Sequence, residues 1–357
     1  MTTRKPLDIC VLRLSAIGDT CNIVPVIHQL RNAFPEARIT WIIGKTEWSL
    51  LQTLPDVEFI TVDKQAGRRE RRQLVRQLQS RTFDVFLHMH ASMRANLISR
   101  HVRATRKIGF DRSRARDFQW LFSSETTAPA ERAHVVDGFL GFLGSLGITP
   151  EPPQWCIPLA DDAVEFASRY CEQPTLIISP CSSDRRQNFR NWAAEHYSRI
   201  VDDAVRKHGL EVVLTGGQTP VERDYGKNIS ALATEPVINL IGKTSLPQLL
   251  ALLTKADVLL CPDSGPAHMA NAVGTPVIGL FATSNRWRTG AYNSQRWAVD
   301  RYPDALAIYN GKSVAQVRWG QRVRDPRAME LIRPEDVSAR LQEFMRYRAS
   351  LTPPEDY

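Results

Sequence analysis

Short apolar runs alternate with segments of helical spacing along this chain of 357 residues, and the alternation restarts in the second half. The predicted strands are residues 7–14, 38–43, 58–62, 83–88, 107–110, 175–179, 211–214, 237–240, 256–260 and 277–281. Strands separated by helices favour parallel sheets, because a parallel neighbour is reached only through a crossover connection. The sequence therefore predicts an α/β fold with two Rossmann-like domains, each built on a doubly wound parallel sheet.

The segment 147–158 marks a break between the two halves. It carries four prolines, Pro150, Pro152, Pro153 and Pro158. Proline fixes φ and lacks a backbone N–H donor, so this spacing predicts an extended connection. We expect an N-terminal domain at 1–152, a C-terminal domain at 153–333, and a terminal helix and tail at 334–357 that pack back toward the N-terminal domain. Ligands bind beyond the carboxyl ends of such strands, so the two domains are expected to face a shared cleft.

Basic residues exceed acidic ones, with a formal net charge of +8. The excess is concentrated in the N-terminal half, in two clusters: Arg68, Arg69, Arg71, Arg72, Arg76 and Arg81, and then Arg94, Arg100, Arg103, Arg106, Lys107, Arg112, Arg114 and Arg116. A run of like charges is often only a solvated helix face, but two clusters in one half favour an acidic partner. Nucleic acid, an anionic membrane surface and a phosphorylated substrate all fit this charge. Aromatic residues are not interleaved with the clusters as stacking platforms for bases would require, which disfavours nucleic acid.

The cysteines and the apolar runs indicate the compartment. The six cysteines lack metal-ligand spacing, and Cys10 and Cys261 lie in strand-like runs, so we expect reduced thiols in the core. No apolar run is long enough to span a bilayer. The run 7–12 is too brief for a signal peptide and leads directly into Arg13. We therefore expect a cytoplasmic protein.

One stretch, 260–272, combines a strand end with a helix start. Asp263 follows the strand, and Ser264 and Gly265 open a helix of small residues. Free backbone N–H groups at a helix start attract anions, and glycine lets the main chain approach a ligand closely. Ser264 or Asp263 can equally be a helix N-cap, so an anion site and a simple cap both remain open.

A second candidate is the turn 15–20, where Gly18 is followed by Asp19. A carboxylate at this edge of a sheet can take a proton from an attacking hydroxyl, although an N-cap on the following helix is the simpler alternative. The turn lacks the G-x-G-x-x-G spacing, which disfavours a dinucleotide site. The chain has no G-x-x-x-x-G-K-[ST] either, so a P-loop enzyme is excluded.

The loop 180–192 is the third candidate. It brings hydroxyls, free N–H groups and several guanidinium groups to one strand end, a set that suits a phosphate or diphosphate. The alternative to a phosphate site is a surface loop in which the arginines serve only solubility. Two weaker turns, 215–217 with Glu222 and 242–245 with Thr244, lie at the same edge and suit a nucleoside. No D-x-D pair or metal-ligand spacing occurs, so no metal is expected.

These motifs resemble those of the lipopolysaccharide heptosyltransferases, glycosyltransferase family 9. The matching segments are 12–19, 182–192, 215–217 and 263–268, in the same order, and the resemblance extends over nearly the whole chain. It implies the GT-B architecture, with the nucleotide sugar bound mainly to the second domain. It also implies an inverting transferase, without metal or other cofactor, that moves heptose from ADP-heptose to the inner core of lipopolysaccharide. We expect such an enzyme in the cytoplasm of a Gram-negative bacterium, with peripheral contact to the inner membrane.

The resemblance also implies roles for single residues. Asp19 matches the general base of the family. The implied donor-binding residues are Ser182, Ser183, Arg190, Glu222, Thr244, Asp263, Ser264 and Gly265. Arg190 stands where the family commonly has a lysine that meets the diphosphate, and Arg185 and Arg186 remain alternatives because the loop is longer here. The implied acceptor-binding residues, for Kdo carboxylates and lipid A phosphates, are Arg68, Arg69, Arg71 and Arg72.

Other functions remain open on the sequence alone. A GT-B transferase that uses another nucleotide sugar on a different glycan would carry similar turns. A non-catalytic protein would use the basic half to bind polyanions, with steep salt dependence. An NAD-dependent oxidoreductase is disfavoured, because its glycine pattern is absent.

Overall fold

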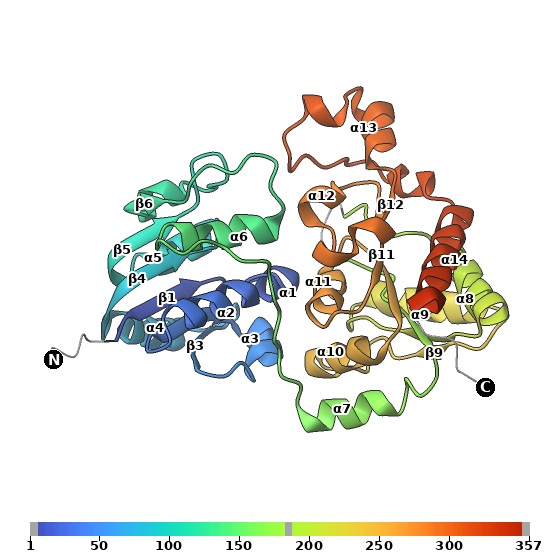
Figure 1. Ribbon diagram of the computed structural model, residues 1–357, viewed down its shortest axis with the longest axis horizontal. Coiled ribbons are helices and arrows are strands. Elements are labelled where there is room, and N and C mark those ends of the chain that lie inside the picture. Colours follow the sequence, from blue (N-terminus) through green and yellow to red (C-terminus); the bar gives the residue numbers. More distant parts are fainter. Residues whose placement is uncertain (1–5, 183–187, 352–357) are drawn as a thin grey trace. The chain divides into compact units, whose positions relative to one another are not determined.

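The computed structural model describes residues 6–182 and 188–351. The chain divides into two compact units, Met1–Pro158 (unit 1) and Leu159–Tyr357 (unit 2). Each unit is a six-stranded parallel sheet flanked by helices (Figure 1). The predicted α/β class with two doubly wound sheets is therefore confirmed.

Unit 1 has the strand order β3-β2-β1-β4-β5-β6. Its strands are β1 (Asp8–Leu12), β2 (Arg38–Gly44), β3 (Val57–Val62), β4 (Thr82–His88), β5 (Arg103–Gly109) and β6 (Glu125–Thr126). Its helices are α1 (Ile17–Cys21), α2 (Val24–Ala33), α3 (Lys45–Leu51), α4 (Arg68–Gln79), α5 (Met93–Ser99) and α6 (Val135–Gly144), with a 3₁₀ turn η1 (Gln119–Phe122). The central strand β1 is buried along its whole length, which explains its nearly continuous apolar sequence.

Unit 2 has the strand order β12-β11-β10-β7-β8-β9. Its strands are β7 (Thr175–Ile178), β8 (Glu211–Leu214), β9 (Ile238–Asn239), β10 (Val258–Pro262), β11 (Val277–Phe281) and β12 (Val299–Asp300). Its helices are α7 (Asp161–Ser168), α8 (Ala194–His208), α9 (Pro220–Leu232), α10 (Leu246–Lys255), α11 (Gly265–Ala272), α12 (Arg286–Thr289), α13 (Tyr302–Asn310) and α14 (Pro334–Leu351). Three 3₁₀ turns complete it: η2 (Tyr292–Trp297), η3 (Val314–Gln316) and η4 (Ala328–Leu331).

Counted in chain order within each unit, both sheets follow the sequence 3-2-1-4-5-6. The order reverses between β1 and β4 in unit 1, and between β7 and β10 in unit 2. At such a reversal the chain leaves the two strand ends in opposite directions, and the crevice between them is where ligands of open α/β sheets bind. We call these two places the switch points.

The boundary between the units lies after Pro158 rather than after residue 152. The extended segment before it is held within unit 1 by reciprocal hydrogen bonds between Gln29 and Glu151, each 2.9 Å long. The Trp155 indole also donates to the carbonyl of Cys21 at 3.1 Å. The proline-rich connection is therefore docked on unit 1 for most of its length.

Helix α14 belongs to unit 2. Val337, Leu341 and Phe344 are buried in the core of that unit. The ring of Phe344 meets that of Trp297 edge to face, with centroids 5.3 Å apart. The described part of the terminal segment, which we expected to pack back toward the N-terminal domain, thus belongs to the core of unit 2.

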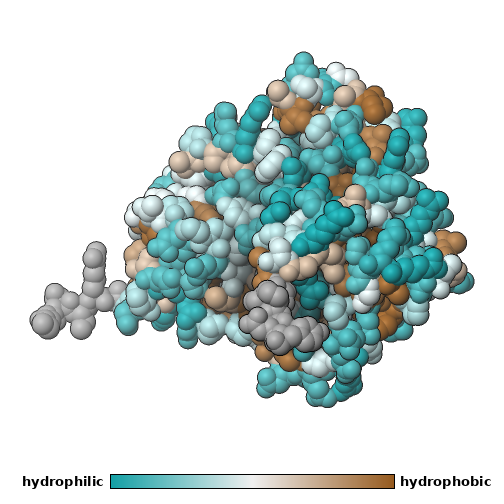
Figure 2. All heavy atoms as spheres, turned by 45° about the vertical axis from the view of Figure 1, so that its right-hand side comes forward, coloured by the Kyte–Doolittle hydropathy of each residue, from teal (hydrophilic) through white to brown (hydrophobic). Residues whose placement is uncertain are grey.

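The face of the molecule in Figure 2 is mainly hydrophilic, and its hydrophobic residues form small separate groups. Most apolar side chains instead fill the cores of the two units. In the described part of the chain, no helix has both the length and the apolar composition needed to cross a bilayer.

The six cysteines are free thiols. Cys10, Cys21, Cys181 and Cys261 are buried, and burial raises the pKa of the last three to about 12. They are protonated at neutral pH and unreactive, as expected for core thiols. Cys156 is exposed, so the prediction of a core position is wrong for that residue.

Candidate functional site

The switch point of unit 1 carries an arginine–aspartate pair. Arg13 follows β1, and its Nη2 forms an ion pair with Oδ2 of Asp19 in α1. Its Nη1 donates to the carbonyl of Met89, just after β4, at 2.7 Å. The guanidinium also lies over the ring of Phe139, 5.1 Å from its centroid. Arg13 therefore links the ends of β1 and β4 and holds the Asp19 carboxylate at the carboxyl edge of the sheet.

Asp19 lies inside α1 and caps no helix. The N-cap residue of α1 is Ala16, and that of α2 is Ile23. The alternative of a simple helix cap is therefore wrong. The side chain keeps 32% of its surface exposed, whereas that of Arg13 keeps 12%. A carboxylate that is oriented from one side and open on the other can meet a ligand.

His90 completes this cluster. The backbone N–H of Leu14 donates to its Nδ1 at 3.0 Å, so the proton of the neutral ring is assigned to Nε2. Burial, reinforced by the Arg13 cation, lowers the pKa of His90 to about 3. The ring is therefore a neutral hydrogen-bond donor at physiological pH. Arg13 lies inside the predicted strand 7–14 and His90 lies two residues after the predicted strand 83–88, and neither was predicted as a site residue.

The switch point of unit 2 is built around Asp263, which directly follows β10. Arg190 Nη1 donates to the Asp263 carbonyl at 2.7 Å and lies 3.5 Å from its Oδ2. Arg322 Nη2 lies 3.9 Å from the same carboxylate oxygen. Asp263 thus holds two guanidinium groups at the carboxyl end of the sheet. Arg322 comes from an irregular segment after η3, and no sequence pattern indicated it.

The loop after β7 is tied to the same cluster. Arg190 Nε donates to Oδ1 of Asn188 at 2.9 Å, and Asn188 Nδ2 donates to Oγ of Ser182 at 2.6 Å. The backbone N–H of Ser182 donates to Oδ1 of Asn191 at 2.9 Å. The structure therefore brings together Ser182, Arg190 and Asp263 as predicted, with Asn188 and Asn191 as supports that the sequence did not single out. Ser183, Arg185 and Arg186 lie outside the described residues.

Helix α11 starts beside Asp263. Ser264 occupies its N-cap position, but its side chain makes no capping hydrogen bond, and Gly265 is the first helical residue. The first backbone N–H groups of a helix have no partner within it. Ser264 and Gly265 therefore lie next to the two guanidinium groups, an arrangement that suits an anion.

Glu222 lies in the first turn of α9, which follows β8, and Thr244 lies in the loop after β9. Glu222 accepts from the backbone N–H of Gly217 at 2.7 Å and closes a capping box with Thr219 at the start of α9. The Gly242 N–H donates to the Gly216 carbonyl at 3.0 Å and joins the loops that follow β8 and β9. Thr244 immediately precedes Ser245, the N-cap of α10. Their contacts with a nucleoside remain predictions.

The four arginines predicted for the acceptor, Arg68, Arg69, Arg71 and Arg72, are exposed on the first turns of α4. Helix α4 follows β3, so they lie at the carboxyl edge of the sheet of unit 1, as Asp19 does. Arg71 Nε donates to the Ala66 carbonyl at 3.0 Å. None of the four forms an ion pair with a carboxylate among the described residues.

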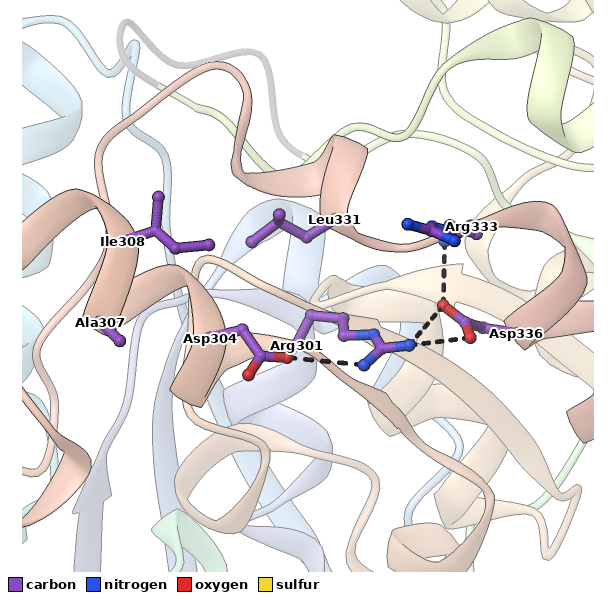
Figure 3. Close-up of a pocket in the computed structure, with 7 residues that line it drawn as sticks. All are labelled: Arg301, Asp304, Ala307, Ile308, Leu331, Arg333 and Asp336. Carbon is purple, nitrogen blue, oxygen red and sulfur yellow. Dashed lines mark hydrogen bonds and ion pairs between the residues drawn. The ribbon is translucent and has the colours of Figure 1, made fainter.

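A separate pocket of about 380 Å³ lies in unit 2 between α13, η4 and the start of α14 (Figure 3). Its lining residues are Arg301, Asp304, Ala307, Ile308, Leu331, Arg333 and Asp336. Arg301 donates to both carboxylate oxygens of Asp336 at 2.9 Å and lies 3.5 Å from Asp304. These charges hold α13 to α14, and the pocket contains none of the predicted site residues. Within residues 6–182 and 188–351, no cluster of three or more His, Cys, Asp or Glu side chains has metal-binding geometry.

Comparison with known proteins gives consistent results. The family model of glycosyltransferase family 9 (heptosyltransferase) matches residues 71–305. The chain is 35% identical to the lipopolysaccharide core heptosyltransferase OpsX of Haemophilus influenzae, over 96% of this chain and 98% of that protein. Its fold is similar to that of a family 9 glycosyl transferase from Veillonella parvula, with a TM-score of 0.77, 20% identity and coverage of 96% and 97%. It is also similar to the Escherichia coli heptosyltransferase WaaC with ADP, with a TM-score of 0.73, 17% identity and coverage of 95% and 100%.

Proposed function

The chain belongs to glycosyltransferase family 9, and from this premise we propose that it transfers heptose from ADP-heptose to the inner core of lipopolysaccharide. Two similar proteins support this: OpsX, a lipopolysaccharide core heptosyltransferase, and WaaC, a heptosyltransferase whose structure was solved with ADP. The observation that carries the proposal is the chemistry of the switch points. Unit 1 offers an oriented carboxylate, and unit 2 offers guanidinium groups beside a helix start.

Asp19 is the proposed general base. The acceptor hydroxyl oxygen forms a bond to the anomeric carbon of heptose while its proton passes to the Asp19 carboxylate. The bond from the anomeric carbon to the β-phosphate oxygen breaks in the same step, and ADP leaves. One direct displacement inverts the configuration at that carbon. Arg13 orients the Asp19 carboxylate through their ion pair, and the Nε2–H of His90 offers a hydrogen bond to a neighbouring acceptor oxygen.

The departing ADP carries the negative charge that develops in this step. Arg190 is proposed to pair with the diphosphate, with hydrogen bonds from Ser182, Ser183 and the backbone N–H groups of Ser264 and Gly265. These groups supply the positive potential that the leaving group needs, so we propose that the reaction requires no metal ion. Asp263 holds Arg190 and faces the sugar-nucleotide.

Glu222 and Thr244 are proposed to contact the nucleoside. Glu222, in the first turn of α9, and Thr244, in the loop after β9, both lie at the carboxyl edge of the sheet of unit 2. Arg68, Arg69, Arg71 and Arg72 are proposed to meet the carboxylates and phosphates of the acceptor, because they are exposed cations at the edge where Asp19 lies. The acceptor is anchored to lipid, so we propose that the enzyme works in the cytoplasm of a Gram-negative bacterium, in peripheral contact with the inner membrane.

Product analysis tests this function. The full-length protein is incubated with ADP-heptose and lipopolysaccharide acceptors truncated at successive core positions, with and without a chelator. We expect ADP release and a mass gain of one heptose on one acceptor, unchanged by the chelator. Thermal-shift titration with ADP-, UDP- and GDP-sugars runs in parallel. Stabilisation by a UDP- or GDP-sugar but not by ADP-heptose would instead support a transferase with another donor.

A further inference from the structure

The large apolar side chains that are exposed in the described part of unit 1 all lie on α5 or on the segment 118–121. They are Met93, Leu97, Phe118, Trp120 and Leu121, and together we call them the α5–η1 surface. Leu121 is 64% exposed and Phe118 is 60% exposed. Met93 and Leu97 are four residues apart on α5 and so share one face of the helix. The helix α5 and the turn η1 contact each other, and a group of exposed apolar side chains on two adjoining elements marks an interaction surface.

The surface is held by specific hydrogen bonds. Asp117 accepts from the backbone N–H of Met93 at 2.9 Å, and its carbonyl accepts from Nδ2 of the buried Asn96 at 2.6 Å. Gln119 is buried, and its side chain donates to the carbonyl of His88, the last residue of β4, at 2.7 Å. Inward anchoring of Gln119 leaves its neighbours Phe118 and Trp120 turned outward, with ring centroids 6.4 Å apart.

The backbone supports the same conclusion. Asp117 has a φ of 50° and Phe118 a φ of 59°, both in the left-handed region that residues with a side chain rarely adopt. Two consecutive residues keep this conformation only where surrounding contacts impose it. The hydrogen bonds to Met93 and Asn96 are those contacts. The exposure of Phe118 is therefore built into the fold.

Four arginines flank the apolar side chains, and they come from the second basic cluster of the sequence. Arg94, Arg100, Arg112 and Arg116 are exposed. None of them forms an ion pair with a carboxylate in the described chain. Other members of the cluster are neutralised, since Arg106 pairs with Glu125 at 2.6 Å and Arg114 pairs with Asp111. Arg112 also lies over the ring of Trp120, 4.9 Å from its centroid. Arg103, at the start of β5, is also exposed and forms no ion pair in the described chain, so the unpaired arginines of the cluster are this residue and the four on or next to α5 and the segment 118–121.

We propose that the α5–η1 surface docks unit 1 on a bilayer that contains anionic lipids. The five apolar side chains enter the boundary between head groups and acyl chains, and the four arginines meet lipid phosphates. Tryptophan and arginine are both suited to this boundary, where one part of the side chain is apolar and the other is hydrated. A second copy of the chain fits less well, because an isologous contact would bring the same unpaired arginines face to face.

A series of hydrogen bonds connects the α5–η1 surface to the switch point of unit 1. Gln119 holds the carbonyl of His88, and Met89 and His90 follow directly and contact Arg13 and Leu14. Docking would therefore bring the lipid-anchored acceptor close to Asp19. In this respect the inference rests on the proposed function, but membrane docking itself can be measured without any turnover.

Vesicle sedimentation with the full-length protein tests the proposal. Phosphatidylcholine vesicles are compared with vesicles that contain about one third phosphatidylglycerol. We expect wild-type protein to bind the anionic vesicles, and the double variant Phe118→Ser/Leu121→Ser to bind them at least about tenfold more weakly. The double variant Arg112→Ala/Arg116→Ala should bind the anionic vesicles more weakly by a similar factor, and its remaining binding should depend less on the salt concentration. The matched control Leu232→Ser, at an exposed leucine of unit 2, should bind as wild type does.

Activity assays separate this inference from the proposed function. The Phe118→Ser/Leu121→Ser variant should keep wild-type turnover on a deacylated, water-soluble acceptor and lose it on an acceptor embedded in vesicles. Equal vesicle binding by the variant and the wild type would overturn the proposal. It would also be overturned if the wild-type protein is a dimer, and the substitutions dissociate this dimer without weakening vesicle binding. If wild-type protein binds vesicles as expected but turns over neither acceptor, the proposed function fails and membrane docking stands. Thermal melting confirms that each variant is folded.

Discussion

The two switch points share one strand order but carry opposite chemistry. In unit 1 the carboxylate of Asp19 is partly open and is held by a largely enclosed arginine. In unit 2 the carboxylate of Asp263 is the more enclosed group, and the guanidinium groups of Arg190 and Arg322 lie beside it. The same crossover geometry therefore positions the proposed proton acceptor in one unit and the proposed anion site in the other. The residues that directly follow the strands, not the sheets, decide which of these forms.

Removing the open carboxylate should have the largest effect. We expect Asp19→Ala to lower kcat by about 10²- to 10⁴-fold, because the acceptor hydroxyl then has no positioned base. ADP affinity, measured by calorimetry, should stay unchanged, since Asp19 belongs to unit 1. Asp19→Asn is the matched control for shape. Near-normal turnover in either variant would remove Asp19 from the mechanism.

Removing the guanidinium group of Arg190 in unit 2 should weaken ADP binding. We expect Arg190→Gln to weaken ADP binding by about 10- to 100-fold, because hydrogen bonds between ions are among the strongest in proteins. Arg190→Lys keeps the charge and loses the forked geometry, so its affinity should be intermediate. Arg322→Gln is the comparison variant, since its guanidinium lies farther from Asp263. Equal ADP affinity in wild type and Arg190→Gln would show that the anion site lies elsewhere.

Acid should weaken unit 1 through its histidines. Burial lowers the pKa of His88 to about 4, and burial reinforced by Arg13 lowers that of His90 to about 3. The unfolded chain binds these protons near pH 6.5, so stability is complete above that pH and falls as the pH drops toward the folded-state values. Each histidine should lower the free energy of unfolding by up to about 2 kcal/mol as the pH falls from 6.5 to 5.

Hydrogen exchange at the two pH values measures this effect unit by unit. The loss of protection should be concentrated in β4, which ends at His88, and in the neighbouring end of β1, because Leu14 just after it donates to His90. His90→Asn, which keeps an acceptor for the Leu14 N–H, should flatten the pH dependence. An equal loss of protection in both units would contradict the assignment to His88 and His90.

The exposed arginines of α4 should give the smallest effect. We expect Arg68→Ala/Arg69→Ala to raise the KM for the acceptor about two- to tenfold and to leave ADP affinity unchanged, because solvent and salt screen exposed cations. The difference from wild type should vanish at high salt. Arg76→Ala, on the same helix but outside the predicted acceptor set, serves as control. If the double substitution leaves the KM for the acceptor unchanged, the acceptor binds to other residues.

Element positions were predictable where the local pattern was strong. Inner strands of each sheet, such as β1 and β11, are buried along their whole length, and their apolar runs were predicted correctly. Strand β5 was predicted only at 107–110, because the preceding residues 103–106 are charged or small and partly exposed. The two-residue strands β6 and β12 and the short helix α12 were missed. Edge elements bury little apolar surface, so their sequences carry little periodic signal.

Local sequence by itself determined the alternation of strands and helices and the loops where chemistry lies, because hydrophobic period and turn residues act between near neighbours. It also predicted Asp19, Ser182, Arg190 and Asp263 at strand ends, where the structure has them. Only the tertiary structure decided which groups meet. Arg190 and Asp263 are 73 residues apart, and His90 and Leu14 are 76 apart. The reversal of strand order brings such distant ends together, and no pattern within a short window of sequence encodes that contact.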